Sequence, residues 1–152
     1  MHNTQLSSDL LHALFVLKSL LGAEFGRSVK PGVCSLSMAE YVLMKWIADT
    51  TSLAEIREYL SVSKAAISQM LSSLEKQGYL MRETDQANRR SLIVSLTPAG
   101  QTILRQKDQK VNSRFEKIIA EMGEADTLEF IRLIAKMNDA LKTSIKKQEG
   151  TI

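Results

Sequence analysis

The sequence predicts a mainly α-helical fold with one pair of short strands. Apolar residues recur at helical spacing before residue 50 and again after residue 97. Two short segments rich in strand-favouring residues, Tyr79–Glu83 and Ser91–Leu96, flank a single polar stretch. The chain has 152 residues, of which 44% are hydrophobic, so it can bury a core without cross-links.

A first helix is expected from about Ser8 to Phe25. Leucines recur at spacings of three and four residues between Leu10 and Leu21, which is the period of one helix face. Residues Arg27–Leu36 are expected to form a loop, because they contain Pro31 and Gly32.

Capping signals define the next three helices. The sequence Ser37–Glu40 is a capping box and opens a second helix that ends near residue 49. A second capping box opens a short helix, Ser52–Leu60. Ser63 is the expected N-cap of a fourth helix, Lys64–Gln77, and Gly78 suits the left-handed end of that helix.

The polar stretch Thr84–Arg90 is expected to be the exposed tip of a hairpin formed by the two strands. Thr97 then reads as the N-cap of a long helix, Pro98–Met122, with proline at the first helical position. Gly123 interrupts the pattern, and a last helix is expected over Ala125–Lys146.

The segment Ser52–Gln77 has the helix-turn-helix arrangement, which presents its second helix to the major groove of DNA. One stripe of that second helix is apolar and expected to be buried. The opposite face is polar and nearly free of acid, so it could approach base edges closely. The stripe comprises Ile67, Met70, Leu71 and Leu74, and the polar face comprises Lys64, Ala65, Ser68, Gln69, Ser72 and Ser73.

The hairpin carries two adjacent arginines, Arg89 and Arg90. A two-stranded wing beside a recognition helix can place an arginine in the adjacent minor groove, where narrow tracts concentrate negative potential. The alternative is a pair of solvated surface arginines.

The run Ser52–Glu83, together with Asn88–Gly100 and its Leu-Thr-Pro-Ala-Gly ending, resembles the MarR family of winged-helix regulators. The resemblance covers essentially the whole chain. It implies a triangular homodimer in which residues 1–36 and 101–152 form the dimerisation helices and residues 37–100 form the winged helix-turn-helix. It further implies repression from a pseudo-palindromic DNA operator, and release from DNA by a small phenolic or other lipophilic effector.

The helix pattern and the resemblance together give eight candidate DNA-binding residues: Ser63, Lys64, Ala66, Ser68, Gln69, Ser73, Arg89 and Arg90. The family's wing commonly carries Asp-x-Arg, whereas this chain has asparagine, Asn88, two residues before Arg90. Asn88 brings no charge, so Asp85 is the acid that could substitute in orienting Arg90.

Cys34 is the only cysteine, which excludes an intramolecular disulfide, and the only histidines are His2 and His12. One cysteine and two histidines are too few to favour a metal site built from His and Cys within one chain. Cys34 is a candidate redox-sensing thiol. We favour an inert loop thiol, because its immediate neighbours bring no positive charge. His12 is expected to be a packing or dimer-interface residue and not a ligand.

We expect a non-enzymatic, cytoplasmic protein without a cofactor. The sequence has no glycine-rich phosphate loop and no set of catalytic residues in local context. We expect no stretch to reach the length of a membrane span. Net charge is only +3, and residues 52–100 carry six basic against five acidic side chains. Two alternatives therefore stay open: a protein-interaction module that does not bind DNA, and a DNA-binding protein without an effector.

Overall fold

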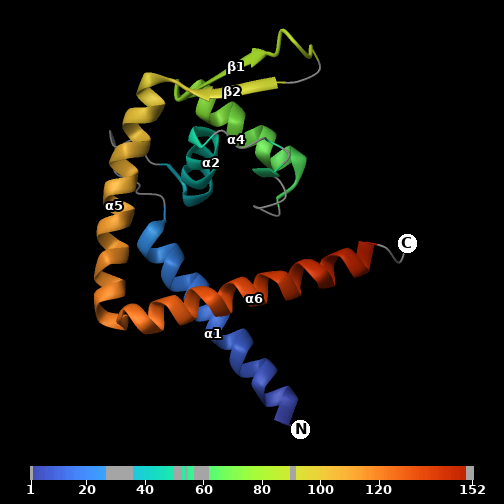
Figure 1. Cartoon of the computed structure of the whole chain (residues 1–152), viewed down its shortest axis with the longest axis vertical. Coiled ribbons are helices and arrows are strands. Elements are labelled where there is room, and N and C mark those ends of the chain that lie inside the picture. Colours follow the sequence, from blue (N-terminus) through green and yellow to red (C-terminus); the bar gives the residue numbers. More distant parts are fainter. Residues whose placement is uncertain are drawn as a thin grey trace. The chain divides into compact units, whose positions relative to one another are not determined.

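The computed structural model describes residues 2–26, 36–49, 53, 55–56, 62–89 and 92–149. The chain divides into two compact units, Met1–Gln109 and Lys110–Ile152. The elements along the chain are α1 (His2–Phe25), α2 (Met38–Ala48), α4 (Lys64–Lys76), β1 (Leu80–Thr84), β2 (Leu92–Leu96), α5 (Pro98–Met122) and α6 (Glu124–Glu149), as Figure 1 shows. The predicted fold, mainly helical with one two-stranded antiparallel sheet, is confirmed.

Helix α1 begins six residues before its predicted start. Its first turns are polar and lack the apolar repeat that marks the rest of the helix. Local side-chain bonds support them, because Gln5 donates to Asp9 and the Ser7 hydroxyl donates to the carbonyl of Asn3. Each bond joins residues four apart, as a helix requires.

The capping box before α2 is confirmed. The backbone N–H of Glu40 donates to Ser37 Oγ at 3.2 Å, and the backbone N–H of Ser37 donates to Glu40 Oε2 at 2.8 Å. Glu40 is only 3% exposed. A buried carboxylate is costly unless it is hydrogen-bonded, so this residue depends on the cap geometry.

Most of the predicted short helix Ser52–Leu60 lies outside the described residues. Leu53, Glu55 and Ile56 are helical, and Ile56 is fully buried. Helix α4 follows, with the Ser63 hydroxyl accepting the backbone N–H of Ala66 as its N-cap.

The apolar stripe of α4 packs inward as predicted. Ile67, Leu71 and Leu74 are at most 4% exposed, whereas Met70 is only half-buried. Helix α4 contacts β1, and α2 contacts β2. The buried core of the first unit includes Leu36, Leu43, Met44, Ile47, Ile56, Ile67, Leu71, Leu74, Leu80 and Leu104.

The strands pair antiparallel, with Leu80 opposite Leu96 and Thr84 opposite Leu92. β1 begins one residue later than predicted. Tyr79 instead uses its carbonyl to accept the backbone N–H of Thr97, which closes the base of the hairpin. The positive φ of Gly78, 77°, turns the chain from α4 into this strand, as expected for a glycine.

Thr97 is confirmed as the N-cap of α5. Its hydroxyl donates to the carbonyl of Gly78 at 2.6 Å and accepts the backbone N–H of Gly100 at 3.0 Å. Gly123, with φ of 85°, separates α5 from α6 as predicted. Helix α6 extends a few residues beyond the predicted range at its C-terminal end.

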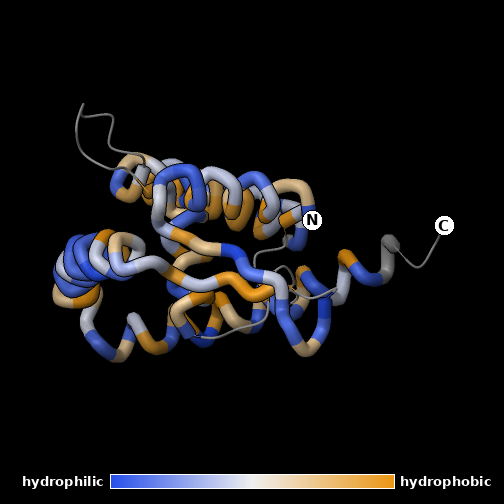
Figure 2. Tube along the Cα trace, turned by 90° about the horizontal axis from the view of Figure 1, so that it is seen from above, coloured by the Kyte–Doolittle hydropathy of each residue, from blue (hydrophilic) through white to orange (hydrophobic). Residues whose placement is uncertain are grey.

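The terminal helices carry many exposed apolar side chains. Figure 2 shows hydrophobic residues recurring along the segment that ends at the C-terminus. In the second unit these exposed residues are Phe115, Ile118, Ile119, Met122, Leu128, Phe130, Ile131, Leu133, Leu141 and Ile145. In α1 they are Leu6, Leu10, Leu11, Phe15, Val16, Leu20 and Leu21. Apolar surfaces of this extent are typical of contact sites, because covering them removes apolar groups from water and lowers the free energy.

The expectation that no stretch reaches the length of a membrane span is wrong. By length and composition, the 23-residue segment Asn3–Phe25 could cross a membrane, and its apolar window is uncovered. Leu10–Leu21 alone is shorter than a membrane span, but the helix continues on either side of it and adds only two charged residues there, Asp9 and Glu24. Length and composition do not distinguish a membrane span from an apolar helix that another protein covers.

Candidate nucleic-acid interface

The N-terminal half of α4 presents a polar face to solvent. Lys64, Ala65, Ser68 and Gln69 are exposed, on the side of the helix opposite to its buried stripe. Ser63 is exposed as well, although its hydroxyl is engaged in the cap. Short side chains next to one amide and one ammonium form a surface that can approach base edges and phosphates.

The C-terminal half of this face is different. Ser72 and Ser73 were predicted to face solvent, but both are half-buried and bonded within the protein. Ser72 Oγ accepts from Arg82 Nη2 at 2.8 Å. Ser73 Oγ donates to Glu40 Oε1 at 3.2 Å and accepts from Gln77 Nε2. These two hydroxyls connect α4 to its neighbours.

Arg82 is a residue that the sequence reading missed. Its Nε also lies 3.0 Å from Glu75 Oε2, an ion pair that lacks the alignment of a hydrogen bond. A signal was available, because alternation along a strand places Arg82 on the same face as Leu80, which is buried. A basic residue on the inward face of a strand needs an acceptor nearby.

The wing, defined here as the β1–β2 hairpin Leu80–Leu96, lies next to α4 at the top of Figure 1. At its tip, Asp85 Oδ1 accepts the backbone N–H of Ala87 at 2.9 Å, so this carboxylate shapes the turn. Asn88 and Arg89 are exposed. Arg90 lies outside the described residues, as does the predicted orienting contact to it.

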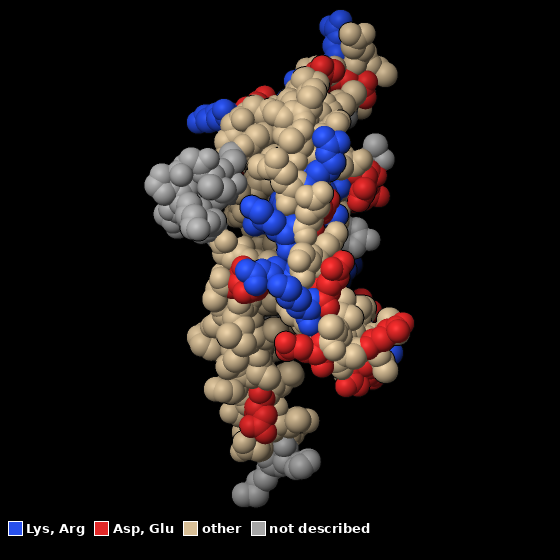
Figure 3. Space-filling model, turned by 90° about the vertical axis from the view of Figure 1, so that its left-hand side faces the viewer, with Lys and Arg blue, Asp and Glu red and all other residues tan. Residues whose placement is uncertain are grey.

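Positive charge is not confined to α4 and the wing. Figure 3, a view onto α5, shows Lys and Arg side chains mixed with Asp and Glu. In α5 itself, Lys107, Lys110, Arg114 and Lys117 recur at helical spacing. The charge distribution alone therefore does not single out one surface for binding nucleic acid.

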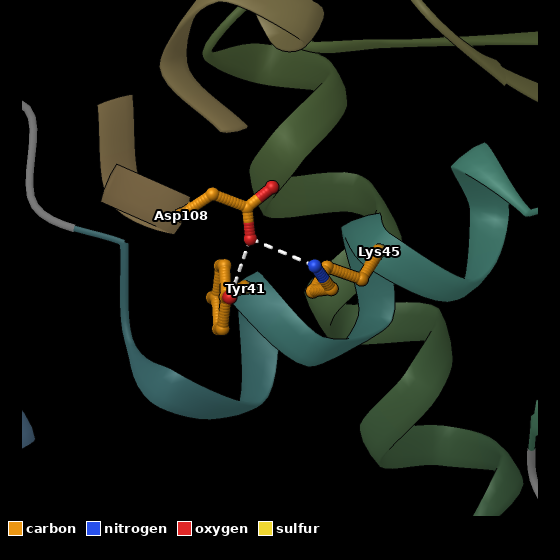
Figure 4. Close-up of polar contacts among 3 residues, drawn as sticks. All are labelled: Tyr41, Lys45 and Asp108. Atoms are coloured by element: carbon orange, nitrogen blue, oxygen red, sulfur yellow. Dashed lines mark hydrogen bonds and ion pairs between the residues drawn. The ribbon is translucent and has the colours of Figure 1, made fainter. Parts of the chain in front are cut away.

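A polar cluster joins α2 to α5 in the first unit (Figure 4). Asp108 Oδ1 accepts from Tyr41 Oη at 2.6 Å and from Lys45 Nζ at 2.8 Å. Burial raises the pKa of Asp108, but the two hydrogen bonds and the charge of Lys45 together hold it below its usual value. Burial, with the neighbouring carboxylate, raises the pKa of Tyr41.

Two further candidate residues from the sequence are Cys34 and His12. Cys34 lies outside the described residues. His12 is exposed on α1, next to Leu11 in the sequence and among the helix's uncovered apolar side chains.

The chain is similar to known DNA-binding proteins. A family model described as a winged helix DNA-binding domain matches residues 47–100. The transcriptional regulator HosA of Escherichia coli O157:H7 is 29% identical over 104 residues, covering 67% of this chain and 77% of the relative. The HTH-type transcriptional repressor Rv2887 of Mycobacterium tuberculosis H37Rv is 24% identical over 132 residues, covering 86% of this chain and 94% of the relative.

Solved structures share the architecture. BpsR of Bordetella bronchiseptica, whose DNA binding is described as regulated by 6-hydroxynicotinic acid, matches with a TM-score of 0.72 and 21% identity over 84% of this chain and 91% of that chain. Wild-type MarR of Escherichia coli in its apo form matches with a TM-score of 0.55 and 22% identity over 67% of this chain and 77% of that chain. Likeness at these identities establishes the fold.

Proposed function

We propose that this chain, which is similar to winged-helix transcriptional regulators, acts as a homodimeric repressor of the MarR type on a pseudo-palindromic operator. The observation that carries the proposal is the exposed N-terminal half of α4, which has no acidic side chain and stands beside a wing. A two-fold dimer would read two half-sites with their centres one helical turn apart, ~10 bp.

On this proposal the reading surface has two parts. In α4, Ser68 and Gln69 would contact base edges, while Ser63, Lys64 and Ala66 would approach the phosphates and the groove floor. Ser73 would contribute indirectly by holding α4 in position, because its hydroxyl is bonded to Glu40. In the wing, Arg90 would enter the minor groove and Arg89 would meet phosphate. Asp85 and Asn88 would shape the tip that carries these arginines.

The dimer proposal is supported by the exposed apolar side chains of the terminal helices. Residues 1–36 and 101–152 would form the dimerisation region, and residues 37–100 would bind DNA. Covering these side chains with a second copy removes apolar surface from water at roughly 25 cal/mol per Å². This accounts for the apolar α1 without a membrane, in keeping with a cytoplasmic regulator.

An effector is proposed by analogy alone. BpsR is described as regulated by 6-hydroxynicotinic acid, a small aromatic acid. We propose that this chain also responds to a small aromatic or lipophilic compound, which would change the spacing or mobility of the two α4 helices in the dimer. A Cys34-based redox response is the alternative form of control.

The test starts with the full-length chain. Its mass in solution, measured by light scattering, should be twice the 17.0 kDa of one chain. The chain should retain specific fragments from sheared DNA of its own genome, and affinity for them should fall steeply with salt as counterions are released. Deleting Ala125–Ile152 should abolish both the dimer and tight binding. A monomer that keeps full affinity would refute the dimer proposal.

A protein-interaction module is the second candidate, favoured by the near balance of charge in residues 52–100. It would retain no DNA fragment at any salt concentration. The salt series therefore separates the two candidates.

A further inference from the structure

Arg82 connects the recognition helix α4 to the wing. Its guanidinium reaches two residues of α4 that lie three apart, donating to Ser72 and pairing with Glu75. Residues three apart share one face of a helix, so both contacts draw the strand against the same side of α4. The side chain of Arg82 is 23% exposed, so these contacts are partly shielded from water.

The position of Arg82 along β1 allows its contacts to restrict the orientation of the hairpin. The hairpin is anchored at its base by Leu80, which is 3% exposed and lies opposite Leu96. Arg82 is the next residue toward the tip on the same face of β1. The pair that follows, Thr84 and Leu92, is exposed. The contacts of Arg82 therefore act at the far end of the buried part of the hairpin.

A two-stranded hairpin held only at its base can pivot. An isolated pair of strands is only marginally stable, and small rotations at the base give large displacements at the tip. The planar guanidinium, with two partners at fixed positions, restricts such rotation more than a single contact would.

We infer that Arg82 is a positioning residue that fixes the angle between α4 and the wing, so that both fit one DNA site at once. The inference rests on the proposed function for its DNA consequence, but the rigid angle itself is a property of the free protein. Loss of Arg82 should leave α4 able to read bases while the wing arginines no longer contribute to binding.

The first experiment measures the angle without DNA. Spin labels at Ala65→Cys in α4 and Ala87→Cys at the wing tip, in a Cys34→Ser background, report the distance between the two elements. The parent should give a narrow distance distribution, Arg82→Met a broad one and Arg82→Lys an intermediate one. Glu83→Gln, on the opposite face of the same strand and exposed, should match the parent. An unchanged distribution in a folded Arg82→Met protein would overturn the inference.

The second experiment uses double-mutant cycles on an operator selected by the parent. Combining Arg82→Met with the double substitution Arg89→Ala/Arg90→Ala should give little further loss of affinity, because the wing has already lost its fixed orientation relative to α4. Combining Arg82→Met with Gln69→Ala should keep the full loss that Gln69→Ala causes alone. A residue that merely stabilised the domain would scale both losses alike, and that result would overturn the inference. If the parent binds no DNA, the proposed function fails while the distance measurement still decides the role of Arg82.

Discussion

Tyr41 Oη donates a 2.6 Å hydrogen bond to Asp108 Oδ1, which joins α2 to α5 across 67 residues of sequence. Lys45, one turn after Tyr41, donates to the same oxygen. The carboxylate thus holds two donors of α2 against the helix that leads out of the winged domain. A movement of α2 relative to α5 would have to break these two hydrogen bonds.

Removing the phenolic hydroxyl tests how much the contact stabilises the fold. Tyr41→Phe keeps the buried ring but loses a hydrogen bond to a charged group, so the free energy of unfolding should fall by ~1–2 kcal/mol. Urea denaturation monitored by circular dichroism would measure the change. Lys45→Met should cost less, because the Lys45 side chain is 44% exposed and its ion pair is screened by water. A larger loss in Lys45→Met than in Tyr41→Phe would contradict this assignment.

The same contact predicts a dependence of stability on pH. Folding holds the pKa of Asp108 below its ordinary value of 3.8, so below that pH the unfolded chain binds protons more readily than the folded one. The stability that Asp108 contributes is present above 3.8 and is lost as the pH falls through the lower, folded pKa. Tyr41 has a raised pKa, so its contribution is present below its ordinary value of 10.0 and is lost as the pH rises through the folded value.

Asp108→Asn isolates the acid part of this effect from other carboxylates. The variant should be less stable than the parent at neutral pH, and the difference between the two should shrink as the pH falls below 3.8, the ordinary pKa of the carboxyl group. Urea midpoints measured across this range would show the convergence. A constant difference would mean that ionisation of Asp108 does not stabilise the fold.

Glu40 should be more important than an ordinary helix cap. Its carboxylate closes the capping box with Ser37 and also accepts the Ser73 hydroxyl from α4. Glu40→Ala should lower the free energy of unfolding by ~2–3 kcal/mol, since a cap contributes ~1 kcal/mol and a half-buried hydroxyl loses its acceptor. Ser73→Ala removes only the second contact and should cost ~1 kcal/mol. Equal losses in thermal melts would show that the link to α4 accounts for the whole effect.

Local rules predicted the ends of most elements. Ser37, Ser63 and Thr97 cap their helices as expected, and Gly78 and Gly123 adopt positive φ. Each of these signals depends on residues within a few positions of one another. That is the range over which sequence fixes backbone geometry.

The contacts between elements could not be predicted in the same way. Nothing near Ser73 in sequence indicates that its partner is Glu40, and nothing near Tyr41 points to Asp108. Both pairs form only when helices pack, so they depend on the tertiary arrangement. The polar face of α4 was therefore predicted too wide, because a half-buried serine and a solvated serine have the same sequence pattern. Strand alternation does indicate that Arg82 points inward, although it does not identify Ser72 as its acceptor.

Gly100 should tolerate no larger residue. A Cβ placed there would lie 2.1 Å from the carbonyl oxygen of Tyr79, a backbone atom that already accepts the N–H of Thr97. Gly100→Ala should destabilise the fold by ~2–3 kcal/mol, because the base of the wing and the first turn of α5 must separate. Gly22→Ala is the matched control, since a Cβ at Gly22 meets no atom within 4 Å inside helix α1. It should be neutral or stabilise the fold by ~0.5–1 kcal/mol in the same melts.

The exposed half of α4 should separate sequence preference from overall affinity. Gln69 and Ser68 are exposed and polar, so Gln69→Ala and Ser68→Ala should each relax discrimination at defined base pairs by ~1–3 kcal/mol. Lys64 stands at the N-terminus of the helix with an ammonium suited to phosphate, so Lys64→Ala should weaken binding to all sequences alike. It should also reduce the slope of log affinity against log salt concentration by about 1, the change expected for one lost phosphate contact. Titrations of a panel of single-base operator variants at two salt concentrations would measure both effects. If Gln69→Ala leaves the ranking of the panel unchanged, Gln69 does not read bases, because a lost base contact must alter the preference at the pair it touched.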